Sequence, residues 1–217
     1  MFGKQFYPTP IELVDQMRCM IDWNRVSAVL EPSAGSGAIA ENICPKFSSK
    51  YSGCKEPARL MDCVEIDPEL CSMLRGKGLN VQQADFLEWS SYTRYDLIAM
   101  NPPFENGAKH LLHAIDLMQN GGQIICLLNA ETIKNPCDIY RQDLAQRLQQ
   151  YGATVKYIQN GFSHALRKTD VETAMVYIDI PKKQYDFSFV DSLATAEDFP
   201  EYEKAKERYS IATDDVI

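Results

Sequence analysis

The sequence has no long apolar run, no secretory leader and no organised cysteine pattern. No window approaches the roughly 18 uninterrupted apolar residues of a membrane span. The first residues, MFGKQFYPTP, lack the charged-then-apolar order of a secretion signal. The seven cysteines are scattered without a CxxC pair, which argues for reduced thiols and against a disulfide framework or a zinc site. We therefore expect a cytoplasmic protein without membrane association.

Positive charge is also scarce, since the formal net charge is −8. A protein that binds nucleic-acid phosphates needs a basic face. From Pro181 onward, nine acidic residues oppose five basic ones, so half of the net charge belongs to this stretch. We expect a folded domain over residues 1–180, with a local basic surface still possible. Residues 181–217 form an acidic C-terminal tail or the start of a further region.

Short apolar runs alternate with amphipathic stretches, which is typical of an α/β fold with a mainly parallel sheet. The first helix is expected to open with Thr9 as N-cap and Pro10 at its first position. Only a dozen residues separate the last two strands, so the final strand should run antiparallel. The expected strands lie near residues 27–31, 60–65, 80–83, 95–100, 123–128, 154–159 and 172–180. The other expected helices lie near residues 36–44, 68–75, 108–119 and 137–150.

The stretch VLEPSAGSG, residues 29–37, is a strand followed by a glycine-rich turn. Gly35 and Gly37 allow the backbone to approach a ligand at the carboxyl end of a strand. The turn matches neither a Walker sequence nor the dinucleotide GxGxxG. Glu31, at the end of the strand, would repel phosphate and attract a cation. An ordinary tight strand–helix turn explains the motif equally well when it is taken alone.

Two further strands also end near carboxylates. In CVEIDP, Glu65 stands where doubly wound folds hold a ribose hydroxyl pair, and Ile66 would lie against a base. Asp67 is expected to cap the next helix. In ADFLEW, Asp85 can accept from an adenine amino group while Phe86 packs on the ring. A turn aspartate with a core phenylalanine remains the simpler reading of that motif.

These motifs, together with TPIELVDQM and YDLIAMNPPF, resemble in order and spacing the catalytic domain of γ-type DNA adenine-N6 methyltransferases. The resemblance covers about residues 5–180. It implies a class I methyltransferase fold: a Rossmann-like, seven-stranded sheet, mainly parallel with the last strand antiparallel, and helices on both faces. It also implies S-adenosyl-L-methionine as the cofactor.

The resemblance assigns roles to the cofactor-site residues. Those expected around the methionine end are Tyr7, Thr9, Pro10, Glu31, Ala34 and Gly35, and Gly37 is expected to bind the cofactor as part of the same turn. Glu65 would hold the ribose, Ile66 and Phe86 would sandwich the adenine, and Asp85 would accept from its amino group. Because this cofactor has no phosphate, the glycine turn needs no lysine.

The turn Asn101, Pro102, Pro103 and Phe104 carries the expected catalytic chemistry. The Asn101 amide oxygen and the Pro102 carbonyl are acceptors suited to the two hydrogens of an amino group. Holding both hydrogens localises the nitrogen lone pair, and the prolines make the geometry rigid beforehand. Phe104 offers a face on which a planar base can stack.

The loop between the last two strands should emerge beside this site. Phe162 is expected to stack on an extruded base, and Arg167 and Lys168 to contact its flanking phosphates. A solvated basic hairpin is almost as good an interpretation of this loop. His110 and His113 lie one helical turn apart without a third ligand, so we expect a solvated helix face and no metal site.

The expected reaction is methylation of the exocyclic N6 of adenine in DNA. Full-length γ-type enzymes carry a target-recognition region after the catalytic domain, whereas this sequence stops soon after Ile180. We therefore expect a specificity subunit or an additional recognition region, and a possible place in a restriction-modification system. The same turn also serves enzymes that methylate RNA bases (adenine N6 or guanine N2) or a protein glutamine amide. A non-catalytic cofactor-binding subunit is the alternative from another class.

Overall fold

The computed structural model describes residues 8–44, 60–159, 161–162 and 172–183. All of the helices and strands named below lie in the first of the chain's two compact units, Met1–Lys182. The expected acidic tail lies outside the described residues, apart from residues 181–183.

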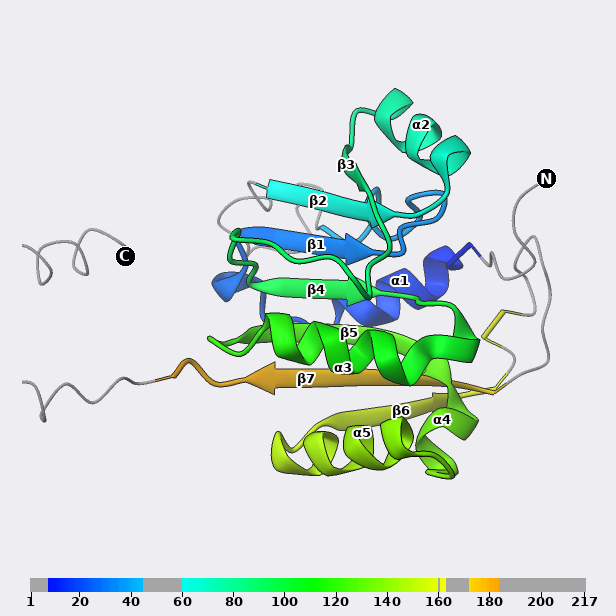
Figure 1. Cartoon of the computed structure of the whole chain (residues 1–217), viewed down its shortest axis with the longest axis vertical. Helices are drawn as coiled ribbons and strands as arrows, with labels where there is room; N and C mark the ends of the chain where they lie inside the picture. Colours follow the sequence, from blue (N-terminus) through cyan, green and yellow to red (C-terminus); the bar gives the residue numbers. More distant parts are fainter. Residues whose placement is uncertain (1–7, 45–59, 160, 163–171, 184–217) are drawn as a thin grey trace, which may run out of the picture. The chain divides into compact units, whose positions relative to one another are not determined.

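The strands form one seven-stranded sheet in the order β3-β2-β1-β4-β5-β7-β6 (Figure 1). Neighbouring strands from β3 to β5 pair in parallel, and β7 runs antiparallel to both β5 and β6. The predicted mainly parallel sheet with an antiparallel last strand is therefore confirmed. The strands are β1 (Ala28–Pro32), β2 (Leu60–Glu65), β3 (Asn80–Gln83), β4 (Leu97–Met100), β5 (Gly122–Asn129), β6 (Thr154–Ile158) and β7 (Thr173–Ile180).

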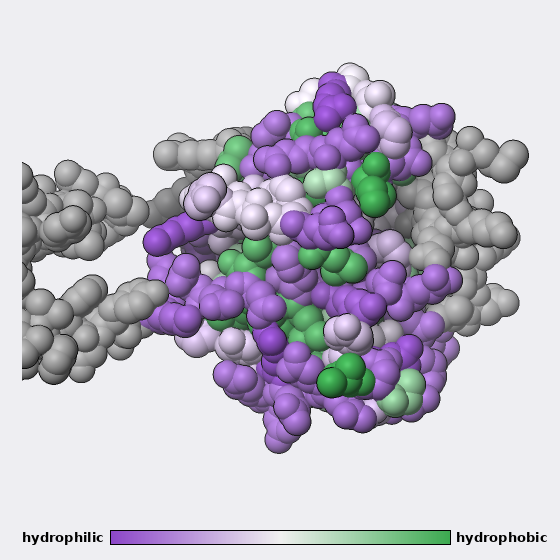
Figure 2. Space-filling view, viewed as in Figure 1, coloured by the Kyte–Doolittle hydropathy of each residue, from purple (hydrophilic) through white to green (hydrophobic). Residues whose placement is uncertain are grey.

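Helices cover both faces of this sheet, as the uninterrupted burial of its central strands requires. Successive residues of β4 point to opposite faces: Leu97 packs in the cluster of α1, and Ile98 in the cluster of α3 and α5. In Figure 1, α3 and α5 lie in front of the sheet and α1 behind it. The helices are α1 (Ile11–Arg18), α2 (Pro68–Gly76), α3 (Gly107–Leu117), α4 (Ala130–Lys134) and α5 (Ile139–Gln150), with 3-10 turns η1 (Trp23–Arg25) and η2 (Phe104–Asn106). The surface seen in Figure 2 is mostly hydrophilic, and its hydrophobic residues form separate small patches.

The predicted helix over residues 36–44 is wrong, because this segment forms a series of turns. The carboxylate of Glu31 accepts a hydrogen bond from the backbone N–H of Ala40 at 2.6 Å. At the end of the segment, Arg18 Nε donates to the carbonyl of Ile43 at 3.1 Å. Both backbone groups are thus bound by side chains from other elements, and local helix propensity does not decide the conformation. The short helix α4, which the sequence pattern did not predict, begins where Asn129 Oδ1 accepts from Glu131 N at 2.9 Å.

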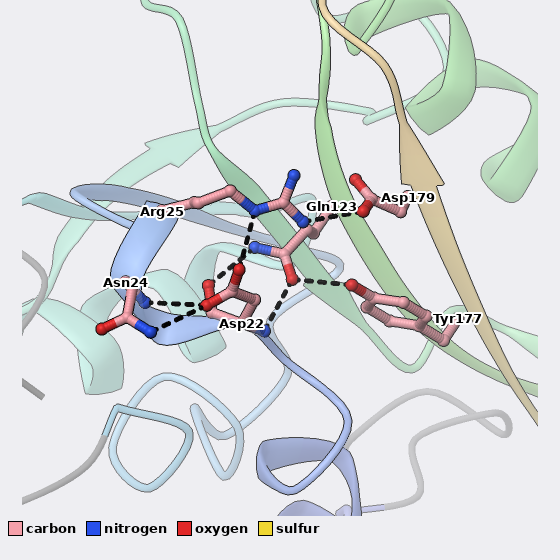
Figure 3. A network of polar contacts seen from close by, with 6 residues as sticks. All are labelled: Asp22, Asn24, Arg25, Gln123, Tyr177 and Asp179. Carbon is pink, nitrogen blue, oxygen red and sulfur yellow. Dashed lines mark hydrogen bonds and ion pairs between the residues drawn. The ribbon is translucent and has the colours of Figure 1, made fainter. Parts of the chain in front are cut away.

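A polar network ties the connection between α1 and β1 to strands β5 and β7 (Figure 3). Gln123 is only 1% exposed. Its side chain accepts from the N–H of Asp22 at 2.8 Å and from the hydroxyl of Tyr177 at 2.8 Å, and it donates to the carbonyl of Asp22 at 3.0 Å. Arg25 bridges Asp22 and Asp179 beside it, at 3.0 and 2.7 Å. The network lies near the amino ends of the parallel strands, opposite the end at which ligands bind in such folds.

Candidate active site

A pocket of about 640 Å³ lies at the carboxyl ends of β1 to β4. Because those strands are parallel, the residues that follow them meet at one edge of the sheet. Most of the residues predicted from the sequence line this pocket. They are Thr9, Glu31, Ala34, Gly35, Glu65, Ile66, Asp85, Phe86, Asn101, Pro102, Pro103 and Phe104.

Among the remaining predicted residues, three that the structure describes are not in the pocket lining: Pro10, Gly37 and Phe162. Pro10 is the N-cap residue of α1. A Cβ on Gly37 would lie 2.7 Å from Leu74 Cδ2, so this glycine serves the close packing of the turn on α2. Phe162 is fully buried. Tyr7, Arg167 and Lys168 lie outside the described residues.

The glycine-rich turn wraps one side of the pocket in left-handed backbone conformations. Ser33 has φ 55° and Gly35 has φ 56°. The left-handed region is costly for a residue with a Cβ, and such strain gathers at functional sites. Ser33 also lines the pocket. The sequence reasoning missed it, although its place in the turn was visible.

Glu65 binds the turn to the end of β2. Its Oε2 accepts from the N–H of Gly35 at 2.7 Å, and its Oε1 accepts from the N–H groups of Ile66 and Asp67 at 2.9 and 3.0 Å. The side chain is 6% exposed and lines the pocket. Three backbone donors therefore hold the carboxylate in one orientation, and Oε2, which accepts only one of these bonds, can still accept a further bond.

Glu31 is a buried carboxyl at the end of β1, 3% exposed. Burial raises the pKa of Glu31 from its ordinary 4.5 to about 8, against the lowering effect of hydrogen bonds from Ala40 and Ile39. The charge of Glu65 raises this pKa further. A nearby cation would favour the ionised form of Glu31.

Two hydrophobic side chains that line the pocket differ in exposure. Phe86 is 2% exposed, whereas Ile66 is 62% exposed. The Oδ1 of Asp85 accepts from the N–H of Leu87 at 2.9 Å, which fixes its side chain. As predicted, Asp67 caps α2, accepting from the N–H groups of residues 69 and 70.

The expectation of a solvated His110 is wrong, since this side chain is 6% exposed and lines the pocket. Its ring lies 5.8 Å from that of Phe86, tilted by 30°. His113 meets Phe86 edge-on at 4.8 Å and binds the carbonyl of Trp89 through Nε2 at 2.8 Å. The available signal was spacing: His110 precedes the buried Ala114 by four residues and so shares its helix face.

Asn101 follows β4, and its side chain is held by Thr9, which also lines the pocket. Its Nδ2 donates to the Oγ1 of Thr9 at 3.0 Å. The expected capping role of Thr9 is wrong, because α1 has no side-chain cap bond. The hydroxyl of Thr9, 8% exposed, instead orients the amide that the sequence assigns to catalysis.

The ring of Phe104 packs against the ring of Phe162. The two rings meet edge-to-face, with centroids 6.0 Å apart and planes at 82°. Phe162 has no exposed surface, so in this structure it supports Phe104 and does not present a face to a base. The expectation that Phe162 itself stacks on an extruded base does not fit this position.

The described charged residues that line the pocket are predominantly acidic. The acidic lining residues are Glu31, Glu65, Asp67 and Asp85, and no lysine or arginine is among the described lining residues. Phosphate would be repelled here, and a ligand with positive charge would be attracted.

Metal and membrane functions find no support within the described part of the chain. It contains no group of three or more His, Cys, Asp or Glu side chains that could hold a metal ion. None of its helices has both the length and the apolar character needed to cross a membrane.

No protein family matches the chain, and no curated protein matches it in sequence. Solved structures do match. The methyltransferase subunit of a type I restriction-modification system from Streptococcus thermophilus has a TM-score of 0.61 at 16% identity, over 86% of this chain and 46% of the subunit. A dimethyladenosine transferase from Plasmodium falciparum has a TM-score of 0.56 at 15% identity, over 82% of this chain and 64% of that protein.

An O-methyltransferase from Bacillus cereus, in complex with S-adenosylhomocysteine (SAH), has a TM-score of 0.53 at 14% identity, over 81% of this chain and 84% of the enzyme. This chain thus spans less than half the length of the restriction-modification subunit and under two thirds of the dimethyladenosine transferase. At such identities the likeness establishes a shared architecture. The chain has the Rossmann-like fold of class I methyltransferases.

Proposed function

We propose that the chain is an S-adenosyl-L-methionine-dependent methyltransferase that acts on the exocyclic N6 of adenine in DNA. The observation that carries this proposal is that one pocket joins two features, its acidic lining and the turn after β4. A carboxylate-lined pocket without described lysine or arginine leads directly to the turn of Asn101 to Phe104. A dinucleotide would bring a pyrophosphate to the turn beside Glu31 and Glu65, whereas a sulfonium cofactor brings positive charge.

The residues present fit this cofactor. Glu31 and the turn around Gly35 would hold its amino-acid end, where an ammonium group favours the ionised form of Glu31. Glu65, fixed by three backbone donors, would accept from the ribose hydroxyls. Ile66 and Phe86 would enclose the adenine, and Asp85 would accept from its amino group.

When bound, the cofactor supplies a methyl group on a positively charged sulfur that leaves as a neutral thioether. The protein's part is to prepare the acceptor nitrogen. The side-chain oxygen of Asn101 and the carbonyl of Pro102 would accept from the two N–H bonds of the amino group, which directs its lone pair at the methyl carbon. One N–C bond forms, and the nitrogen loses one proton to solvent. Phe104, braced by Phe162, would stack on the flipped base.

Adenine in DNA is supported by the resemblance of the sequence motifs to γ-type enzymes and by the shared fold of the restriction-modification subunit. The dimethyladenosine transferase shares the fold as well, so RNA adenine is the second candidate. Flipping a base costs a few kcal/mol, and we propose that a specificity subunit or a further recognition region supplies the binding energy.

The test is transfer of labelled methyl from S-adenosyl-L-methionine to unmethylated DNA, to structured RNA and to protein, followed by digestion of the product. We expect N6-methyladenine in DNA. Asn101→Ala should abolish transfer. Asn24→Ala is the matched control, because that asparagine lies in the network at the far end of the strands. Label in RNA or protein would contradict the proposed substrate. Failure of the chain to bind SAH would contradict the proposed cofactor.

A further inference from the structure

His110 has one ring nitrogen bound within the protein. It lies in the first turn of α3, and its Nδ1 is 3.0 Å from the carbonyl oxygen of Asn106. A carbonyl only accepts, so Nδ1 carries the proton of this bond. Burial lowers the pKa of His110, against the raising effects of the Asn106 bond and of the charge of Asp85. The imidazole is therefore neutral at pH 7, and its Nε2 is an acceptor.

The second ring nitrogen faces the pocket. His110 lines the pocket, and no described residue donates to its Nε2. Within the described part of the chain, Thr173 Oγ1 is the one buried side-chain polar atom without a partner. The Nε2 of His110 is not a second such atom, so it is not closed off from solvent, and the open space that His110 lines is the pocket. The His110 ring lies beside that of Phe86, and Asp85, which follows β3, also lines the pocket.

We propose that His110 is a specificity-determining residue that, with Asp85, selects a 6-aminopurine at this end of the pocket. This rests on the proposed function, since it concerns the base of the same cofactor. Asp85 and the neutral imidazole are both acceptors, and an exocyclic amino group offers two N–H donors. A 6-oxopurine presents an oxygen acceptor there, so the same two groups would be left unpaired against it.

A purely structural role for His110 is the alternative, because its ring also packs on Phe86. Substitutions at two histidines of α3, His110 and His113, distinguish these two roles. His113 contacts the same phenylalanine ring, but its Nε2 is taken up by Trp89 and it is not among the residues lining the pocket. His110→Phe keeps a flat ring and removes both nitrogens, and His113→Phe makes the same change outside the pocket.

The experiment is calorimetric titration of the full chain with S-adenosyl-L-homocysteine and S-inosyl-L-homocysteine, with the melting temperature of each variant as the folding check. Wild type should prefer the adenosyl compound, and His110→Phe should lower that preference about three- to tenfold, the worth of one hydrogen bond. His113→Phe should keep it. His110→Gln, which retains a donor for Asn106 and an acceptor, should keep most of it. If His110→Phe does not fold, His110→Leu takes its place.

The outcomes separate this inference from the proposed function. An unchanged preference in His110→Phe would overturn the inference and leave the cofactor site standing. An equal loss in His113→Phe would assign the effect to packing on Phe86 and would also overturn it. If wild type binds neither compound, both the inference and the proposed cofactor fail.

Discussion

Thr9 and Asn101, which both line the pocket, are joined by a hydrogen bond in which Asn101 Nδ2 donates to Thr9 Oγ1 at 3.0 Å. The residue before the first helix thus orients the residue after the fourth strand. The bond assigns the nitrogen side of the amide to Thr9 and fixes which side carries the oxygen that we propose as the acceptor for the amino group.

Thr9→Val removes this acceptor and keeps the shape of the side chain. We expect methyl transfer to slow about three- to tenfold, the effect of one hydrogen bond on orientation. The affinity for SAH should stay the same, and Thr9→Ser should restore the rate. Kinetics of transfer together with SAH titration give both numbers. Weakened SAH binding at an unchanged turnover would show that Thr9 acts on the cofactor and not on Asn101.

Glu31→Gln should change how stability depends on pH. Burial raises the pKa of Glu31 from 4.5 to about 8, so between these values the folded chain retains a proton that the unfolded chain has lost. The unfolding free energy of wild type should therefore fall as pH rises through this window, by up to about 5 kcal/mol from this group. Glutamine has no such proton but can still accept from Ala40. Urea denaturation at pH 5 and pH 8 should show a smaller fall in the variant, and equal falls would contradict the buried, protonated Glu31.

Gly37→Ala should destabilise the chain more than Gly78→Ala does. Both glycines have φ +81°, so both variants carry the same backbone strain, about 1 kcal/mol. A Cβ at Gly37 would in addition lie 2.7 Å from Leu74 Cδ2, whereas nothing lies within 4 Å of one at Gly78. We expect a further loss of about 1–3 kcal/mol for Gly37→Ala. Denaturation midpoints measure both variants, and equal losses would mean that the turn is not packed closely on α2.

Gln123→Leu should lower stability without weakening SAH binding. The substitution leaves the N–H of Asp22 and the hydroxyl of Tyr177 without their acceptor, which costs about 2–4 kcal/mol. The exposed Asn24→Ala in the same network should change stability by no more than about 0.5 kcal/mol. Because the network and the pocket lie at opposite ends of the strands, weaker SAH binding by folded Gln123→Leu would contradict their independence.

Local patterns predicted the sheet well, because the runs around β1, β2, β4 and β5 are largely buried on both faces and are therefore mainly apolar. The carboxylates at the ends of the strands were equally visible, since parallel strands bring such residues to one edge.

Features made by contacts between distant segments were missed. The turns after β1 depend on Glu31 and Arg18, which bind backbone groups of that segment from other elements. The burial of His110 depends on how α3 docks on Phe86. The role of Thr9 depends on a residue 92 positions away. No local pattern encodes these contacts, although the spacing of His110 and Ala114 on α3 does indicate which face of the helix His110 shares.

The most direct test of the central claim is a comparison of wild type with Asn101→Ala in two measurements on the same preparation: SAH affinity, and transfer of labelled methyl to adenine in DNA. The account predicts equal SAH affinity and loss of transfer in the variant by at least about a hundredfold, the scale of removing one positioned polar group from a reacting centre. Transfer by Asn101→Ala at the wild-type rate would contradict the account, because the turn after β4 would then not be where the reaction occurs.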